Sequence, residues 1–322
     1  MLRYILYRLL LMIPVVLGVT FVVFSLMFIA PGDPVAMVLG PDATDEEIHE
    51  IREELGLNDP FLVQFGRYVY NVFVRFDLGT SIVHRRSITD EIIQRAPATF
   101  MVAGISTAMA LLIGVPLGVM AAAKQFTWKD NVSMLLAIFG VSMPGFWVAL
   151  MLVLLFALRL EWLPATGLAD WRGYILPCIS VALVGAATIA RQARSSMLEV
   201  IRQDYVTTAR AKGQTERKVI NVHALRNALL PIITTVGNIL GATLGGVVVI
   251  ETVFAIPGLG VFMVTAVRNR DFPGVQGSVL VIAIVFSLMM LLIDLVFAFV
   301  DPRIKARYKG ARKPKKIPKE VG

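Results

Sequence analysis

Six long stretches of apolar residues alternate with polar segments along the chain. They cover residues 9–30, 98–123, 131–158, 173–190, 228–250 and 279–300. A helix needs about 20 apolar residues to cross the hydrocarbon core of a bilayer, and only helices or closed barrels satisfy the backbone there. One charged residue, Asp294, lies inside the six stretches. The pattern predicts an all-α integral membrane protein with six transmembrane helices. We expect Asp294 to bond a neighbouring helix rather than couple an ion.

The basic residues predict the orientation of these helices. The first set of connections, expected on the cytoplasmic side, carries 21 Lys and Arg, and the second set, expected outside, carries 10. The first set is 1–8, 124–130, 191–227 and 301–322, and the second is 31–97, 159–172 and 251–278. Lys and Arg concentrate on the cytoplasmic side, so both termini are predicted to be cytoplasmic. Residues 9–30 are too long for a typical signal peptide and lack its cleavage site, which favours an uncleaved first helix.

The composition agrees with a protein that lies mostly in lipid. Hydrophobic residues make up 57% of the 322-residue chain and charged residues 17%, against about 45–50% and about 25% in soluble domains. This excludes a disordered chain, a disulfide scaffold and a nucleic-acid-binding module. The net charge of +8 then reflects topology, and the basic tail 301–322 is expected on anionic lipid or in solvent. Cys178 is the single cysteine and is interpreted as a packed small apolar residue.

The outer segment 31–97 is predicted to be helical and is rich in acidic residues, with 12 acids against 6 bases. Thr44 and Glu47 have the spacing of a capping box, which predicts a short helix over 44–55. Apolar residues at helical spacing over 61–73 predict a second, amphipathic helix. The segment either covers the membrane helices or binds an external partner, with Glu46 and Glu50 as candidate docking residues.

Small residues and prolines punctuate the spans. Glycines recur four apart at Gly114 and Gly118 and at Gly237, Gly241 and Gly245, a spacing that lets helices approach closely in lipid. Prolines at 116, 144, 177 and 231 favour kinks. A translocation pathway lined by spans three, four and five is one hypothesis, and ordinary bundle packing is the alternative. Candidate pathway residues are Pro144, Phe146, Trp147 and Asn238.

The inner connection 191–227 is too polar to span the membrane and is rich in helix-forming residues. Small side chains at Thr207, Thr208, Ala209 and Ala211 form a stretch that ends at Gly213, and Thr215 is placed to cap a second helix. A short exposed helix of small residues between basic flanks suits insertion into the groove of a partner. A juxtamembrane helix on anionic lipid is the alternative.

Motifs for catalysis and ion coupling are absent from the sequence. It contains no P-loop, no H-E-x-x-H and no G-x-S-x-G, which are the motifs expected of a nucleotide hydrolase, a zinc protease and a serine hydrolase. The six spans contain no His, Lys, Arg or Glu, whereas ion-coupled transporters carry ionisable groups there. Translocation driven by other chains is therefore favoured. An ion-coupled secondary transporter and an integral membrane enzyme remain the alternatives.

The inner connection also resembles a known family. The run from Asp204 to Gly213, followed by residues 223–231, is similar to the permease signature of bacterial ABC importers, and more narrowly to the first permease subunit of the dipeptide/oligopeptide/nickel family. Further family-like motifs are Ala30–Pro34, Leu55–Pro60, Asp77–Ser81, Pro97–Thr99, Pro144–Trp147, Leu163–Gly167, Glu251–Gly260 and Asp301–Arg303. Two features depart from the general importer signature: Thr207-Thr208-Ala209 replaces Glu-Ala-Ala, and Pro231 follows Gly213 by 18 residues.

The resemblance implies a type I importer permease in a bacterial or archaeal plasma membrane, which is not an enzyme. Its implied partners are a homologous second permease, two ATP-binding cassette subunits and an extracytoplasmic substrate-binding protein. The chain itself would hold no metal and no cofactor, because ATP and Mg would bind the ATPase subunits. Its implied cargo is a dipeptide or oligopeptide, or a related solute such as a nickel chelate or glutathione. The residues that would contact the ATPases are Asp204, Tyr205, Thr208, Ala209, Arg210, Ala211, Lys212 and Gly213.

Overall fold

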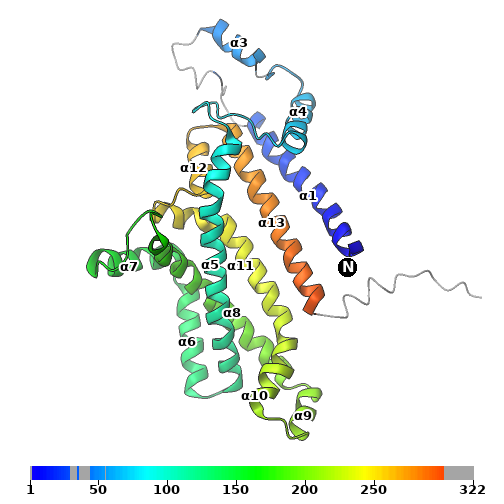
Figure 1. The fold of residues 1–322 in the computed structure, drawn as a ribbon, viewed down its shortest axis with the longest axis vertical. Helices are drawn as coiled ribbons and strands as arrows, with labels where there is room; N and C mark the ends of the chain where they lie inside the picture. Colours follow the sequence, from blue (N-terminus) through cyan, green and yellow to red (C-terminus); the bar gives the residue numbers. More distant parts are fainter. Residues whose placement is uncertain (1, 30–34, 36–43, 55, 301–322) are drawn as a thin grey trace, which may run out of the picture.

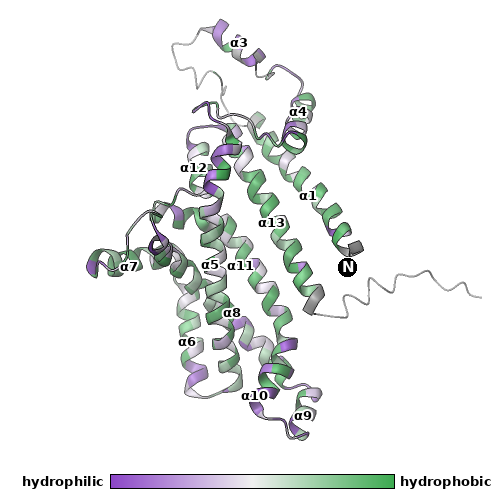
Figure 2. Cartoon of the chain, viewed as in Figure 1, coloured by the Kyte–Doolittle hydropathy of each residue, from purple (hydrophilic) through white to green (hydrophobic). Residues whose placement is uncertain are grey.

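The computed structural model describes residues 2–29, 35, 44–54 and 56–300, and its regular secondary structure over these residues is helical (Figure 1). Five long helices are apolar enough to cross a membrane. They are α1 (Leu2–Ile29), α5 (Ile88–Ala123), α8 (Ile175–Ile201), α11 (Leu225–Val253) and α13 (Phe272–Val300). Figure 2 shows hydrophobic residues along their lengths and hydrophilic residues gathered towards the two ends of the bundle. The prediction of an all-α membrane protein is confirmed.

The third predicted span is not one continuous helix. It consists of α6 (Trp128–Ser142), α7 (Gly145–Leu152) and a π-helix, η1 (Val153–Arg159), and the chain bends by 99° between Ser142 and Gly145. Met143 and Pro144 are extended, with ψ of 127° and 132°, as expected for a residue before proline and for a helix N-cap. The expectation of one helix over 131–158 is therefore wrong. The structure has six spans only if this bent pair is counted as one.

Several helices are longer than the apolar stretches within them. α5 begins at Ile88, ten residues before the predicted start, because the Ser87 hydroxyl accepts a hydrogen bond from the Asp90 N–H at 3.3 Å and caps the helix. α8 continues to Ile201 beyond the predicted end at residue 190. The connections predicted over 31–97 and 191–227 are correspondingly shorter than the sequence predicts.

Glycines join the long helices at close range. A Cβ atom at Gly114 would lie 2.7 Å from the Ala186 carbonyl oxygen and 2.8 Å from Ile189 Cβ, so α5 and α8 are in contact there. Gly118 faces α8 in the same way, and Gly237 and Gly241 of α11 face Ile293 and Phe286 of α13. These four glycines confirm the packing interpretation of their motifs. Gly245 has nothing within 4 Å of its Cβ position.

Two ion pairs connect helices that are distant in the sequence. Arg194 of α8 donates two hydrogen bonds, of 2.6 and 2.8 Å, to the buried carboxylate of Asp130 in α6. Arg8 of α1 lies 2.9 Å from the carboxylate of Asp294 in α13. The predicted bond from Asp294 to a neighbouring helix is thus confirmed.

Two short helices, α3 (Asp45–Glu54) and α4 (Phe61–Val74), lie at the end of α1 that is remote from the N-terminus, with α4 beside α1 and α3 farther out (Figure 1). The predicted capping box is present: the Glu47 N–H donates to the Thr44 hydroxyl at 3.3 Å, and the Thr44 N–H donates to the Glu47 carboxylate at 3.0 Å. α4 packs on α1 through aromatic rings whose centres lie 4.9 to 5.7 Å apart. These rings belong to Phe21, Phe24, Phe28, Phe61, Phe65 and Tyr68.

Candidate functional site

The short helix α9 (Asp204–Ala211) lies at the end of the bundle opposite to α3 and α4 (Figure 1). It connects α8 to α10 (Glu216–Lys218), a π-helix, η3 (Val219–Ala224), and α11. Val206 is completely buried in a cluster that we call the inner cluster, made of Ala122, Met197, Val206, Val219, Ala224 and Ala228. This cluster joins α9 to α5, α8 and α11.

The exposed surface of α9 contains most of the residues that the sequence singled out. Asp204, Tyr205, Thr208, Arg210, Ala211, Lys212 and Gly213 are exposed. Ala209 is half-buried and packs against the inner cluster. The small side chains that are exposed on α9 are those of Thr207, Thr208 and Ala211, and a partner contact at Ala209 stays a prediction.

Side-chain bonds hold α9 in place. Arg210 donates hydrogen bonds of 3.1 and 2.8 Å to the Glu216 carboxylate, which raise the pKa of Arg210. The Asn227 amide donates to the Tyr205 hydroxyl at 2.6 Å. Residues on both sides of the 213–215 turn are thus tied together, and α9 is fixed to the start of α11.

Gly213 ends α9 in a left-handed conformation, with φ of +75°. Its N–H donates to the Arg210 carbonyl at 2.9 Å, and the next N–H, of Gln214, donates to the Ala209 carbonyl at 3.3 Å. Residues with a side chain rarely adopt this φ. Glycine at this position therefore lets the chain turn sharply back towards α10.

A second candidate site is an apolar groove of about 270 Å³ between α7, α8 and α11. Gly145 of α7 lines it, together with Ser180, Gly185 and Thr188 of α8 and Thr243 of α11, among others. The Ser180 and Thr188 hydroxyls bond carbonyl groups of their own helix, at 2.7 and 3.2 Å, so the groove presents few unsatisfied polar groups.

The four predicted pathway residues lie near this groove but do not line it. Pro144 and Phe146 flank the lining residue Gly145, and Asn238 precedes the lining residue Ile239. Phe146 and Trp147 are 49% and 43% exposed on α7. Sequence reasoning missed Ser180, Thr188 and Thr243, for which the available signal was a hydroxyl within an otherwise apolar span.

The two predicted docking residues of the outer segment, Glu46 and Glu50, are exposed on α3. Within the described ranges, no group of three or more His, Cys, Asp and Glu side chains is arranged to hold a metal ion.

The sequence matches two family models. Residues 114–306 match the binding-protein-dependent transport system inner membrane component family, and residues 1–103 match the N-terminal model of the same membrane component.

Curated relatives are similar over nearly the whole chain. The dipeptide transport system permease protein DppB of Alkalihalophilus pseudofirmus is 41% identical over 333 residues, which cover 95% of this chain and 100% of the relative. The glutathione transport system permease protein GsiC of Salmonella paratyphi A is 41% identical over 309 residues, covering 96% of this chain and 100% of the relative. A putative peptide transport system permease protein of Brucella abortus is 40% identical over 301 residues, covering 91% of this chain and 96% of the relative.

A solved structure shares the fold at low sequence identity. A chain of the MetNI methionine ABC transporter in an inward-facing conformation aligns with a TM-score of 0.55 and 17% identity, covering 65% of this chain and 96% of that chain. The prediction of an importer permease fold is confirmed.

Proposed function

The chain belongs to the binding-protein-dependent transport system inner membrane component family, and we propose that it forms one half of the translocation pathway of an ATP-driven peptide importer. It is a non-catalytic, multi-pass permease subunit of the inner membrane. Neither a secondary transporter nor a membrane enzyme is favoured, because the relatives are named as permeases of peptide and glutathione transport systems.

The exposed surface of α9 is the observation that carries this proposal. α9 offers Asp204, Tyr205, Thr208 and Ala211 to a partner, while Val206 is buried in the inner cluster. In the proposed arrangement an ATPase subunit binds this surface. Movement of the ATPase then reaches α5, α8 and α11 through the inner cluster.

The partner set follows from this arrangement. A homologous second permease covers the side of the bundle where α7 exposes Phe146 and Trp147. Two ATP-binding cassette subunits bind ATP and Mg and drive a two-state change in access. We place both termini and α9 on the cytoplasmic side, as the basic residues predict.

Two regions are assigned to solute and to its delivery. The groove lined by Gly145, Ser180 and Thr243 contributes to the pathway, together with the nearby residues Pro144, Phe146, Trp147 and Asn238. On the outer side, α3 contacts the substrate-binding protein through Glu46 and Glu50.

The proposed cargo is a dipeptide or oligopeptide. The dipeptide and peptide permeases among the relatives support this class, and the glutathione permease, at the same 41% identity, makes glutathione a second candidate. A nickel chelate is a third solute for the uptake assay.

Reconstitution tests the proposal. The chain is co-expressed with its candidate second permease and ATPases, purified, and placed in vesicles with the binding protein outside. We expect ATP-dependent uptake of labelled peptide by the complex and none by this chain alone. Uphill uptake by the isolated chain, or purification without any ATPase, would contradict the proposal.

A further inference from the structure

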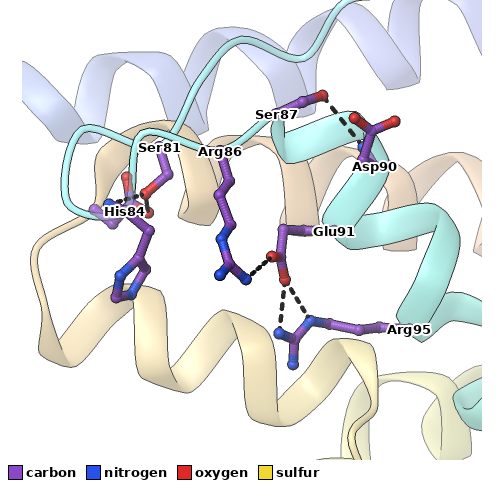
Figure 3. A network of polar contacts seen from close by, with 8 residues as sticks. Ser81, His84, Arg86, Ser87, Asp90, Glu91 and Arg95 are labelled. Atoms are coloured by element: carbon purple, nitrogen blue, oxygen red, sulfur yellow. Dashed lines mark hydrogen bonds and ion pairs between the residues drawn. The ribbon is translucent and has the colours of Figure 1, made fainter.

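A polar cavity of about 390 Å³ lies at the outer end of the bundle, away from α9 and from the groove. The loop before α5, the first two turns of α5, and α12 (Leu259–Arg268) with the residues after it form its walls. Among the lining side chains are His84, Arg86, Glu91, Arg95 and Asn269. Figure 3 shows the side chains of His84, Arg86, Glu91 and Arg95 directed into the space between the loop, α5 and α12.

Hydrogen bonds fix the wall of the cavity that the loop provides. The Ser81 hydroxyl donates to the Asp271 carboxylate at 2.6 Å, and the Ile82 N–H donates to the same carboxylate at 3.2 Å. The Ser81 N–H donates to the Arg86 carbonyl at 2.8 Å and closes the loop on itself. The cavity is therefore held open by bonds between segments about 190 residues apart.

Two guanidinium groups converge on one carboxylate inside the cavity (Figure 3). Arg95 donates to Glu91 at 2.9 and 2.6 Å, and Arg86 approaches Glu91 at 3.4 Å from the loop. The Arg95 guanidinium also lies 5.0 Å from the centre of the Phe262 ring, which is a cation–π contact. A guanidinium carries five N–H donors, so most donors of the two arginines are not engaged with Glu91.

The accessible charge in the cavity is positive. Asp271 is 2% exposed and accepts bonds from the loop, and the Glu91 side chain is 15% exposed. The Arg86 side chain is 74% exposed at the rim, and that of Arg95 is 31% exposed. A ligand entering from outside therefore meets guanidinium groups first, and their planar forks match a carboxylate. The two acidic groups behind them disfavour a dianionic phosphate.

We propose that this cavity receives a carboxylate side chain, Asp or Glu, of the substrate-binding protein when that protein docks. The inference rests on the proposed function, because the binding protein is the partner that approaches this end of the bundle. Arg86 makes the first contact, and Arg95, held by Glu91 and Phe262, completes a two-arginine clamp.

Charge reversal at two neighbouring arginines tests the inference. The complete complex is placed in nanodiscs, and the binding protein used is the one whose addition raises its ATP hydrolysis. Arg86→Glu is compared with Arg85→Glu, which makes the same charge change at an exposed residue outside the cavity lining. We expect Arg86→Glu to raise the Kd for the binding protein about tenfold or more, about 1.4 kcal/mol per tenfold. Arg85→Glu should change it less than about threefold, as expected for screened surface charge.

Two further measurements make the result specific. Arg86→Lys keeps the charge but loses the fork, so its Kd should lie between those of the unmodified chain and Arg86→Glu. A Lys substitution at one acidic residue of the binding protein should restore binding to Arg86→Glu. Equal effects of Arg85→Glu and Arg86→Glu would overturn the clamp while leaving the proposed function intact. Failure of any binding protein to stimulate the unmodified complex would overturn the proposed function itself.

Discussion

The Thr99 hydroxyl donates a hydrogen bond of 2.6 Å to Oε1 of Glu251, joining α5 to α11 across 152 positions of sequence. Both side chains are buried. The same hydroxyl accepts the Leu259 N–H at 2.8 Å, and Oε2 of Glu251 accepts the Val261 N–H at 2.9 Å. These groups satisfy N–H donors at the start of α12, where a helix otherwise leaves them free.

Replacing Thr99 should therefore loosen α12. Thr99→Val removes the hydroxyl, so the Glu251 carboxylate and the Leu259 N–H each lose a hydrogen bond while they stay buried. The loss should lower the free energy of unfolding by about 1–3 kcal/mol. Thr99→Ser keeps the hydroxyl and loses one methyl group, about 0.8 kcal/mol. We expect a clearly lower melting temperature of the detergent-purified protein for Thr99→Val than for Thr99→Ser. Equal melting temperatures would show that the hydroxyl does not stabilise this junction.

A matched pair of glycines on α5 tests close packing in the membrane. Gly114→Ala places a Cβ against Ala186 and Ile189 of α8, whereas Gly104 has nothing within 4 Å of its Cβ position. Overpacking costs about 1–3 kcal/mol, and Ala is intrinsically about 1 kcal/mol more helix-favouring than Gly. Gly114→Ala should lower the melting temperature, and Gly104→Ala should leave it unchanged or raise it. A lower melting temperature for Gly104→Ala than for Gly114→Ala would mean that α5 contacts its neighbours through another surface.

The exposed surface of α9 should control coupling. Ala211→Trp adds a large side chain there without touching the inner cluster, so the protein should still fold and insert. In the reconstituted complex we expect peptide uptake to fall about tenfold or more, corresponding to about 1.4 kcal/mol or more, with ATP hydrolysis no longer matched to uptake.

The control for this substitution is Lys124→Trp, in the turn after α5. Lys124 is exposed at the same end of the bundle, two residues beyond Ala122 of the inner cluster. The Lys124→Trp substitution should leave peptide uptake, and its match to ATP hydrolysis, close to those of the unmodified complex. Full uptake by Ala211→Trp would mean that no ATPase binds this surface.

The capping box of α3 should respond to pH. Hydrogen bonds from the Thr44 backbone N–H and hydroxyl lower the pKa of Glu47 below its ordinary value. A lowered folded-state pKa stabilises the helix above the unfolded pKa of about 4.3, and the stabilisation is lost as the pH falls through the folded value. NMR shifts of residues 45–54 in nanodiscs should report fraying of α3 in that acidic range. Glu47→Gln should remove this pH dependence, and a pH-independent α3 in the unmodified chain would argue against the cap.

Hydropathy predicts the long helices well because each of them needs about 20 apolar residues to cross the hydrocarbon core of the bilayer. It does not predict the 99° bend after Ser142, because the residues on both sides of Pro144 are equally apolar. A proline signals a possible kink, but its size depends on packing. α7 exposes Phe146 and Trp147, and no pattern within this chain indicates what covers them.

Polar residues near the helix ends are the other limit of sequence reasoning. Arg194 looks like part of a polar connection, yet α8 continues through it, and Asp130 provides its guanidinium with a buried partner. Glu251 follows the last residue of an apolar stretch, yet it is fully buried. The usable signal was Gly258 and Gly260, whose missing side chains leave space for this carboxylate.

The ion pair between Arg8 and Asp294 has a consequence for biogenesis. Its partners are separated by 286 positions, and a chain emerges from the ribosome N-terminus first. During almost all of translation the carboxylate of Asp294 is not yet available to the Arg8 side chain. The first helix synthesised therefore completes its contacts only when the last one arrives.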